Sequence, residues 1–359
     1  MKKLLAMLLA LVMVLSFAAC SNEESVVEDP TDDPAVEEPT DEPEEEPTEE
    51  PAAATYTLGM GVSASTGSTK DGNAQADVTV AVVVLDAEGK IVKAQIDCAQ
   101  TKLNTAEFPA DLSTVDVRSK WTKKEDYGMV VASPIGAEWY TQVDALEEAV
   151  VGMTAADLEA LELVESNGHM ITTNEAIYAG CTMDMTGFKD ALVKACNDEY
   201  AKEFSADSFT LGLAVETSVG SSKAATADAA GLAALYTNFT GVAYDAEGKV
   251  LACLLDVIQV KISFDAAGVC TQPEDLRTKK ELKGDYGMLP ASAIGVEWMD
   301  QATAFEAAVV GMTAEEVAAI ETVESNGHQV PADETLHAAC SMDITGFQSG
   351  FTASLNNVK

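Results

Sequence analysis

The chain has 359 residues, and its 60 acidic side chains outnumber 21 basic ones, which gives a formal net charge of −39. A charge of this sign repels nucleic acid, and no basic cluster with interleaved aromatic residues offsets it. We therefore expect no nucleic-acid partner. The chain has only three histidines and neither a Cys-x-x-Cys nor a His-Glu-x-x-His pattern, so we also predict no metal site.

The first 20 residues have the pattern of a bacterial lipoprotein signal peptide. Two lysines precede an apolar run at residues 4–17 that is too short to span a bilayer permanently, and a small-residue processing site ends at Cys20. Lipidation of Cys20 is expected to anchor the protein on the extracytoplasmic face of the cell membrane, as in Gram-positive-type bacteria. An ordinary secretory signal with a chance cysteine is the alternative.

Residues 21–54 form an acidic, proline-rich segment without a basic residue. Such a composition has too few apolar side chains to offset the entropy of ordering, and its like charges repel one another. We predict a disordered tether that holds the rest of the chain away from the membrane. An acidic arm that binds a basic partner is the alternative.

A block of about 150 residues then occurs twice. The sequence Asp-Tyr-Gly-Met at residues 126–129 returns at 285–288, and Val-Glu-Ser-Asn-Gly-His at 164–169 returns at 323–328, both with an offset of 159. A period of this length exceeds that of solenoid repeats, so each copy is expected to bury its own core. We predict two tandem homologous modules, residues 55–204 and 207–359.

Each module begins with a strand pattern. Apolar and β-branched runs flank an Asp-Ala-Glu-Gly turn and predict a three-stranded antiparallel meander. The predicted strands are residues 56–64, 78–85 and 91–97 in the first module, and 209–216, 235–244 and 250–257 in the second.

The second part of each module has helical periodicity. Trp139 and Trp298 each start an apolar stripe with helical spacing, and Thr154 and Thr313 are placed to cap a short second helix. A last helix is predicted from Gly187 to residue 204, and from residue 346 to the C-terminus. The predicted class is therefore α+β, with about three strands and about three helices in each module.

Polar residues shared by both copies are the candidates for chemistry. Thr182 and Ser341 precede a helix N-terminus, where free backbone N–H groups favour a phosphate. The alternative is that Asp184 or Thr186 merely caps this helix. The other shared pairs are Arg118/Arg277, Lys120/Lys279, Lys124/Lys283, Tyr127/Tyr286, Met129/Met288 and Ser133/Ser292.

These motifs, in this order, resemble the small FMN-binding domain. The resemblance rests on the hairpin motif Asp-x-x-Gly-Lys, the Trp-bearing helix and a small-small-hydroxyl motif before the final helix, and it covers roughly residues 78–195 and 235–351. The family occurs in subunits of Rnf-type and sodium-translocating electron-transfer complexes and in flavin-carrying lipoproteins of Gram-positive bacteria. In it, the threonine of a Gly-Ala-Thr triplet carries FMN through a phosphoester.

The resemblance implies FMN as cofactor, with Thr182 of the triplet that starts at Gly180 as the attachment residue and Ser341 in the same role. Tyr127 and Tyr286 are then contacts of the flavin ring. A flavin transferase and a surface electron-transfer partner are implied as well. Both triplets carry cysteine in place of alanine, and neither copy has the family's acid at its usual position. These departures put covalent attachment in doubt and leave open a divergent member that binds another ligand or none.

Two functions follow from these patterns. The first is a lipid-anchored protein whose two FMN-binding-like modules carry flavin for electron transfer at the cell surface. The second is a non-enzymatic lipoprotein that captures a small solute or a cell-wall component. A hydrolase is not expected, because the chain has no Gly-x-Ser-x-Gly motif and no Ser/His/Asp set repeated in both copies. The pocket of the second function would use Arg118, Lys120, Tyr127, Arg277, Lys279 and Tyr286.

Overall fold

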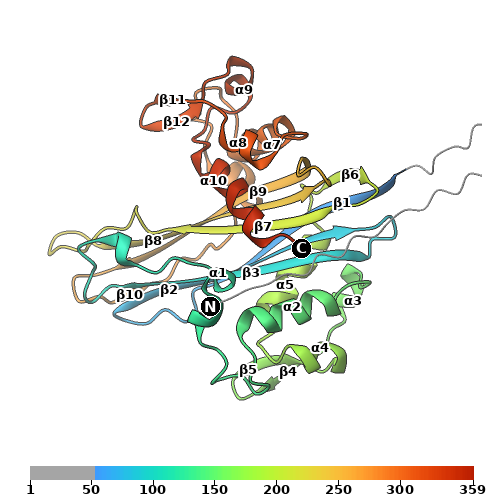
Figure 1. Cartoon of the computed structure of the whole chain (residues 1–359). Coiled ribbons are helices and arrows are strands. Elements are labelled where there is room, and N and C mark those ends of the chain that lie inside the picture. The colour runs from blue at the N-terminus through green and yellow to red at the C-terminus, as the bar shows by residue number, and fades with distance from the viewer. Residues whose placement is uncertain (1–52) are drawn as a thin grey trace, which may run out of the picture. The chain divides into compact units, whose positions relative to one another are not determined.

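Two four-stranded antiparallel β-sheets carry the fold, one from each half of the chain (Figure 1). The structure is a computed structural model that describes residues 53–359. The predicted signal peptide with Cys20, and all but the last two residues of the predicted tether, lie outside this range. Below, residues 53–206 are called the first half and residues 207–359 the second half.

The first sheet has the strand order β3-β2-β1-β6, and the second sheet has the order β10-β9-β8-β7. Each is a meander of three long strands with one short strand added at an edge. The strands of the first sheet are β1 (Ala54–Ser65), β2 (Asn73–Leu85), β3 (Ile91–Asn104) and β6 (Lys202–Ala206). Those of the second sheet are β7 (Thr210–Ser218), β8 (Gly231–Tyr244), β9 (Val250–Phe264) and β10 (Cys270–Thr271).

Each half also has five α-helices and a small two-stranded hairpin. In the first half these are α1 (Lys120–Lys123), α2 (Trp139–Ala149), α3 (Ala155–Glu159), α4 (Glu175–Gly180), α5 (Thr186–Cys196), β4 (Leu163–Ser166) and β5 (His169–Thr172). In the second half they are α6 (Lys279–Leu282), α7 (Trp298–Ala308), α8 (Ala314–Ala318), α9 (Glu334–Ala339), α10 (Thr345–Ser354), β11 (Thr322–Ser325) and β12 (His328–Pro331). Short 3₁₀ helices follow α1, α6 and α10 at η2 (Lys124–Tyr127), η3 (Lys283–Tyr286) and η4 (Leu355–Asn357).

The mixed α+β class with antiparallel sheets is as predicted. All six predicted strands are present, although β3 and β9 continue well beyond their predicted ends. The predicted caps are also confirmed, because Thr154 with Asp157 and Thr313 with Glu316 each form a complete capping box.

The predicted last helix of the first half is too long. It ends at Cys196, and residues 202–206 form β6, which pairs with β1. The carboxylate of Asp198 explains the break, because it accepts hydrogen bonds from Met60 N at 3.0 Å and from Tyr200 N at 2.8 Å. These bonds hold residues 198–200 beside β1, so that the following residues can pair with β1 as β6.

The inner faces of the two sheets pack on each other and form one shared core. Val80 and Val82 of the first sheet and Phe239 and Leu254 of the second belong to this core, and each is at most 1% exposed. Each half does bury a core of its own beneath its helices, as predicted, but the shared core shows that it also depends on the other half, which was not predicted. The long apolar run of β2 gives the reason, because a strand that is apolar on both sides needs a covering layer on both.

Helices cover the outer face of each sheet. Leu146 of α2 and Leu192 of α5 pack on the outer face of the first sheet, and Phe305 of α7 and Phe351 of α10 pack on that of the second. Figure 1 shows α2 and α5 on one side of the paired sheets and α7 and α10 on the other. The layers are thus helix, sheet, sheet, helix.

A glycine allows the sheets to approach closely at the centre of the shared core. Val82 and Gly241 stand at equivalent positions of the two sheets, 159 residues apart. A Cβ atom on Gly241 would lie 2.8 Å from Cγ2 of Val82 and 3.1 Å from Cε of Met60. The two sheets can therefore meet here only because one of the two equivalent positions lacks a side chain.

In each sheet a buried glutamate binds a long strand, β3 or β9, at a position where that strand has a neighbouring strand on one side only. Glu147 Oε1 accepts a hydrogen bond from Ile96 N of β3 at 2.7 Å, and Glu306 Oε1 accepts one from Leu255 N of β9 at 2.8 Å. Each glutamate also binds a lysine of the opposite half. Lys359 Nζ forms an ion pair with Glu147, and Lys202 Nζ lies 3.0 Å from Glu306 Oε2.

We predict that Gly241→Val destabilises the protein by about 1–3 kcal/mol, because its side chain would overlap Val82. The double variant with Val82→Gly moves the same volume to the opposite sheet. The loss of unfolding free energy in the double variant should therefore be smaller, by about 1 kcal/mol or more, than the sum of the losses in the two single variants. Urea unfolding of the wild type, both single variants and the double variant measures this coupling, and strict additivity would contradict the packing argument.

Candidate functional site

Thr182 and Ser341, the predicted attachment residues, each bind a glutamine of their own half. The N and Oγ1 atoms of Thr182 lie 3.0 and 3.1 Å from Gln142 Oε1. The N and Oγ atoms of Ser341 lie 2.8 and 3.3 Å from Gln301 Oε1. Thr182 is buried and Ser341 is half-buried. Both hydroxyl groups therefore already have a hydrogen-bond partner within the fold.

An aspartate of the chain binds the first backbone N–H group of α5 and of α10, which we call the closing helix of each half. Asp184 Oδ1 accepts from Thr186 N at 2.9 Å, and Asp343 Oδ1 accepts from Thr345 N at 3.0 Å. Although burial acts in the opposite direction, hydrogen bonds of this kind lower the pKa of both aspartates. The aspartate thus binds the first N–H group of each helix from one residue before the N-cap position, which is Met185 or Ile344 and makes no side-chain cap bond.

Gln142 and Gln301 were not predicted, yet they join several of the shared residues. Gln142 is fully buried, and its Nε2 atom donates to Ser133 Oγ at 3.0 Å and to the carbonyl of Ala137 at 3.1 Å. Gln301 makes the same bonds to Ser292 and Val296. The sequence feature that could have indicated them is a glutamine three residues after the tryptophan in both copies. Its contacts hold the loop before each closing helix, which is a structural role.

Gly180 and the two arginines also have structural partners. A Cβ atom on Gly180 would lie 2.6 Å from Cβ of Ala145, so the glycine allows α4 to pack against α2. Arg118 forms ion pairs with Asp116 at 3.0 Å and Asp126 at 2.8 Å. In the second half Arg277 binds Asp275 at 2.8 Å and Asp285 at 3.0 Å. Each arginine is thus held by acids close to it in the sequence.

Tyr127 and Tyr286 lie beside a lysine in what we call the aromatic–lysine cluster of each half. Lys120 Nζ lies 4.9 Å from the ring centroid of Tyr127 and 5.6 Å from that of Trp139. Lys279 Nζ lies 4.7 Å from the ring of Tyr286 and 4.9 Å from that of Trp298. The structure thus brings the predicted lysines and tyrosines together.

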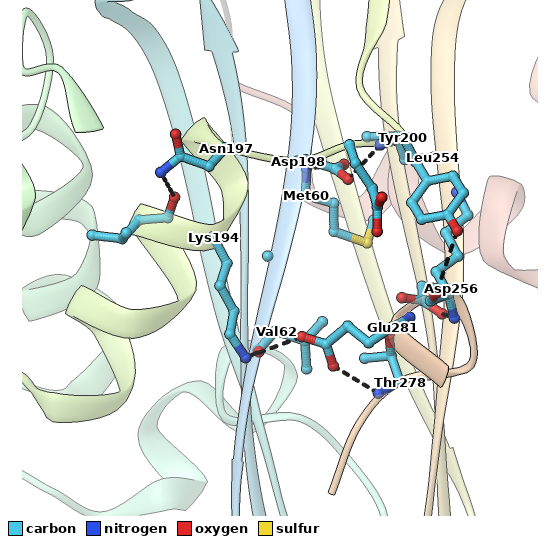
Figure 2. A pocket seen from close by; sticks show the side chains of 14 residues that line it. Met60, Val62, Lys194, Asn197, Asp198, Tyr200, Leu254, Asp256, Thr278 and Glu281 are labelled. Atoms are coloured by element: carbon cyan, nitrogen blue, oxygen red, sulfur yellow. Dashed lines mark hydrogen bonds and ion pairs between the residues drawn. The ribbon is translucent and has the colours of Figure 1, made fainter. Parts of the chain in front are cut away.

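A cleft of about 310 Å³ lies between the two halves, and the sequence did not predict it (Figure 2). It is lined by β1, by the chain that follows α5, by β9 and by α6. Asp198, Tyr200, Asp256 and Lys280 are among its polar lining residues, and Met60 and Leu254 are among the apolar ones. The other polar lining residues are Lys194, Asn197, Glu199, Thr278 and Glu281. A cleft of this volume is at the lower end of the range for small-molecule sites.

Two carboxylates in this cleft lack a cationic partner. Asp198 accepts the two backbone N–H bonds described above, and Asp256 Oδ1 accepts from Val257 N at 2.7 Å and from Lys280 N at 3.1 Å. Neither aspartate forms an ion pair with any residue from 53 to 359. Burial raises the pKa of Asp256 to about 6 and also raises the pKa of Asp198.

The lysines that line the cleft are bound by other groups. Lys280 Nζ lies 2.6 Å from Glu306 Oε1, and Lys194 Nζ lies 3.1 Å from Glu281 Oε1 and 2.9 Å from the carbonyl oxygen of Val62. Figure 2 shows Lys194 and Glu281 joined across the lower part of the cleft. The charge of Lys280 also opposes the rise in the pKa of both aspartates, but its ammonium group is not within ion-pair distance of either carboxylate.

One signal for this cleft was present in the sequence. Asp97 and Asp256 interrupt otherwise apolar strands at the same place in both copies, and a buried charge in such a run requires special partners. Asp198 and Lys280 gave no such signal, because the other copy has Asn357 and Trp121 at the corresponding positions.

Comparison of the chain with protein-family models, with curated proteins and with solved structures found no match. Among the described residues, no group of three or more His, Cys, Asp or Glu side chains is arranged to hold a metal ion.

We predict that Thr182→Ala lowers the free energy of unfolding by about 1 kcal/mol, because it removes the bond from the hydroxyl to Gln142. We also expect it to leave the intact mass unchanged when the protein is co-expressed with a flavin transferase. Chemical denaturation and intact-mass spectrometry measure the two effects. A flavin adduct that is present in the wild type and lost in the variant would contradict the structural role.

Proposed function

We propose that the chain is a non-enzymatic binding protein made of two homologous modules, and that it captures a small primary amine in the cleft between them. The observation that carries this proposal is the pair of unpaired carboxylates, Asp198 and Asp256, at one cleft of about 310 Å³. A desolvated carboxylate without a cation is unfavourable, so an ammonium group would gain from binding to both.

The chemistry of the cleft fits an amine in further respects. An ammonium group has three donors, and both aspartates keep acceptor capacity beyond the backbone N–H groups that they already bind. Met60 and Leu254 would contact the aliphatic part of such a ligand. The ring of Tyr200 also lines the cleft. One face of this ring is already in contact with Lys280, whose Nζ atom lies 5.1 Å from the ring centroid.

The sequence-based expectation of a lipid on Cys20 fits this proposal. Anchored on the extracytoplasmic face of the membrane and carried on an acidic tether, the cleft would meet solutes outside the cell. The acidic charge of the chain would also attract organic cations toward it.

Flavin-based electron transfer is the competing hypothesis. A phosphoester at Thr182 would require the buried hydroxyl to leave Gln142, and one at Ser341 would require the same of Gln301. The structure therefore favours solute capture over covalent flavin. Noncovalent FMN would give the protein a visible absorption spectrum when it is purified from its own host.

We predict that the purified protein binds putrescine, a small diamine, and that Asp198→Asn and Asp256→Asn each weaken this binding at least about tenfold. Loss of a charge-assisted hydrogen bond costs about 1.5–3 kcal/mol, and each 1.4 kcal/mol corresponds to about a factor of ten. Isothermal titration calorimetry measures the dissociation constants.

Asp97→Asn is the matched control for this experiment. Asp97 Oδ1 accepts from Cys98 N at 2.6 Å and from Trp121 N at 3.0 Å, as Asp256 accepts from Val257 and Lys280, but Asp97 does not line the cleft. It should leave putrescine binding unchanged. Glutarate, a dicarboxylate of similar length, serves as the charge-reversed probe. Binding of glutarate without binding of putrescine would refute the proposal.

The affinity for putrescine should fall with pH. Because burial raises the pKa of Asp256 to about 6, its carboxylate takes up a proton as the pH falls below that value and loses its attraction for the ammonium group. Titrations from about pH 7.5 to about pH 5 should show this weakening, and the profile should be flatter in Asp256→Asn. An affinity that rises on acidification would disagree with the assignment.

A further inference from the structure

An ion pair between the two halves closes the lower end of the cleft. Lys194 Nζ of α5 lies 3.1 Å from Glu281 Oε1 of α6 and donates to the carbonyl oxygen of Val62 at 2.9 Å. Figure 2 shows this pair below Asp198, which lies in the upper part of the same cleft. The cleft thus has carboxylates toward both of its ends, but the lower one already binds an ammonium group.

Glu281 is held at the cleft by bonds that do not involve Lys194. Its Oε2 atom accepts from Thr278 N at 2.8 Å, and Glu281 N donates to Thr278 Oγ1 at 3.2 Å, which together form the capping box of α6. The side chain of Glu281 is 33% exposed. Its carboxylate can therefore remain in the same place when Lys194 moves away.

Lys194 has a second anionic partner, which lies outside the cleft. Asp190 precedes it by one turn of α5, and its Oδ2 atom lies 3.5 Å from Lys194 Nζ. Asp190 is not among the residues that line the cleft. Opposite charges at this spacing attract each other on a helix surface. Because Lys194 is 41% exposed, its ammonium group can turn from Glu281 to Asp190 without becoming buried and unpaired.

We propose that the ligand of the cleft is a diamine and that Lys194 is a gate that gives up Glu281 to the second ammonium group of this ligand. The first ammonium group binds Asp198 and Asp256. The second takes the place of Lys194 Nζ at Glu281, and Lys194 turns to Asp190. This inference rests on the amine binding proposed above and specifies the class of amine. Half-exposed ion pairs are weak, so little is lost when the diamine replaces Lys194.

The test compares putrescine with n-butylamine, which has the same carbon chain but only one ammonium group. Lys194→Met removes the competing ammonium group and leaves Glu281 free for the ligand. The ratio of the dissociation constant of n-butylamine to that of putrescine should therefore rise at least about threefold in this variant, which is the size expected for one half-exposed ion pair. Isothermal titration calorimetry of both amines with the wild type and the variant measures this ratio.

Two further variants serve as controls. Lys189→Met removes the same charge from α5, but Lys189 donates to the carbonyl oxygens of Glu159 and Leu161 and does not line the cleft. It should leave the ratio at the wild-type value. The double variant with Lys194→Met and Glu281→Gln keeps an acceptor for the capping box but lacks the lower carboxylate. Its ratio should fall at least about threefold below that of Lys194→Met alone.

The outcomes separate this inference from the proposed function. If neither the wild type nor Lys194→Met binds either amine, both proposals are overturned. If the wild type binds putrescine but Lys194→Met leaves the ratio unchanged, the gate is refuted and amine binding stands. An equal rise of the ratio in Lys189→Met would refute the gate as well, because it would show a general effect of charge.

Discussion

The burial of two β-sheets against each other is the constraint on which the rest of this structure depends. Because each inner face is covered by the other sheet, the strands are apolar on both faces, and the outer faces need helices to cover them. The close approach at Gly241 sets the spacing at the centre of this packing. Towards the rim the layers contain polar groups from both halves, and the cleft with Asp198 and Asp256 lies there.

The two halves share the positions that build the fold and differ at those that offer binding chemistry. Gln142 and Gln301 make the same hydrogen bonds, as do the arginines at 118 and 277 within their loops. In contrast, Asp198 and Lys280 of the cleft correspond, at the offset of 159, to Asn357 and Trp121 in the other half. The proposed cleft depends on such differences. Two similar halves with different side chains can therefore form a binding site at their boundary.

Local patterns predicted much of the fold, and long-range contacts account for what they missed. The capping threonines and the stripes that start at the tryptophans depend on neighbours within a few residues, and the structure confirms them. The end of α5 depends on the bond from Asp198 to Met60, 138 residues away, and the partner of Thr182 is 40 residues away. No periodicity or spacing contains such pairs, so the strand β6 could not be predicted, and the sequence indicated the cleft only through the acid that interrupts β9 at Asp256.

The buried glutamates at the sheet edges have a consequence for the behaviour of the chain in concentrated solution. A strand with unpaired backbone N–H and C=O groups can pair with a strand of a neighbouring molecule, and repeated pairing of this kind leads to fibrils. Glu147 and Glu306 each bind one backbone N–H group of β3 or β9 that no neighbouring strand occupies. The side chains that connect the two halves thus also remove two of the donors with which a strand of another molecule could pair.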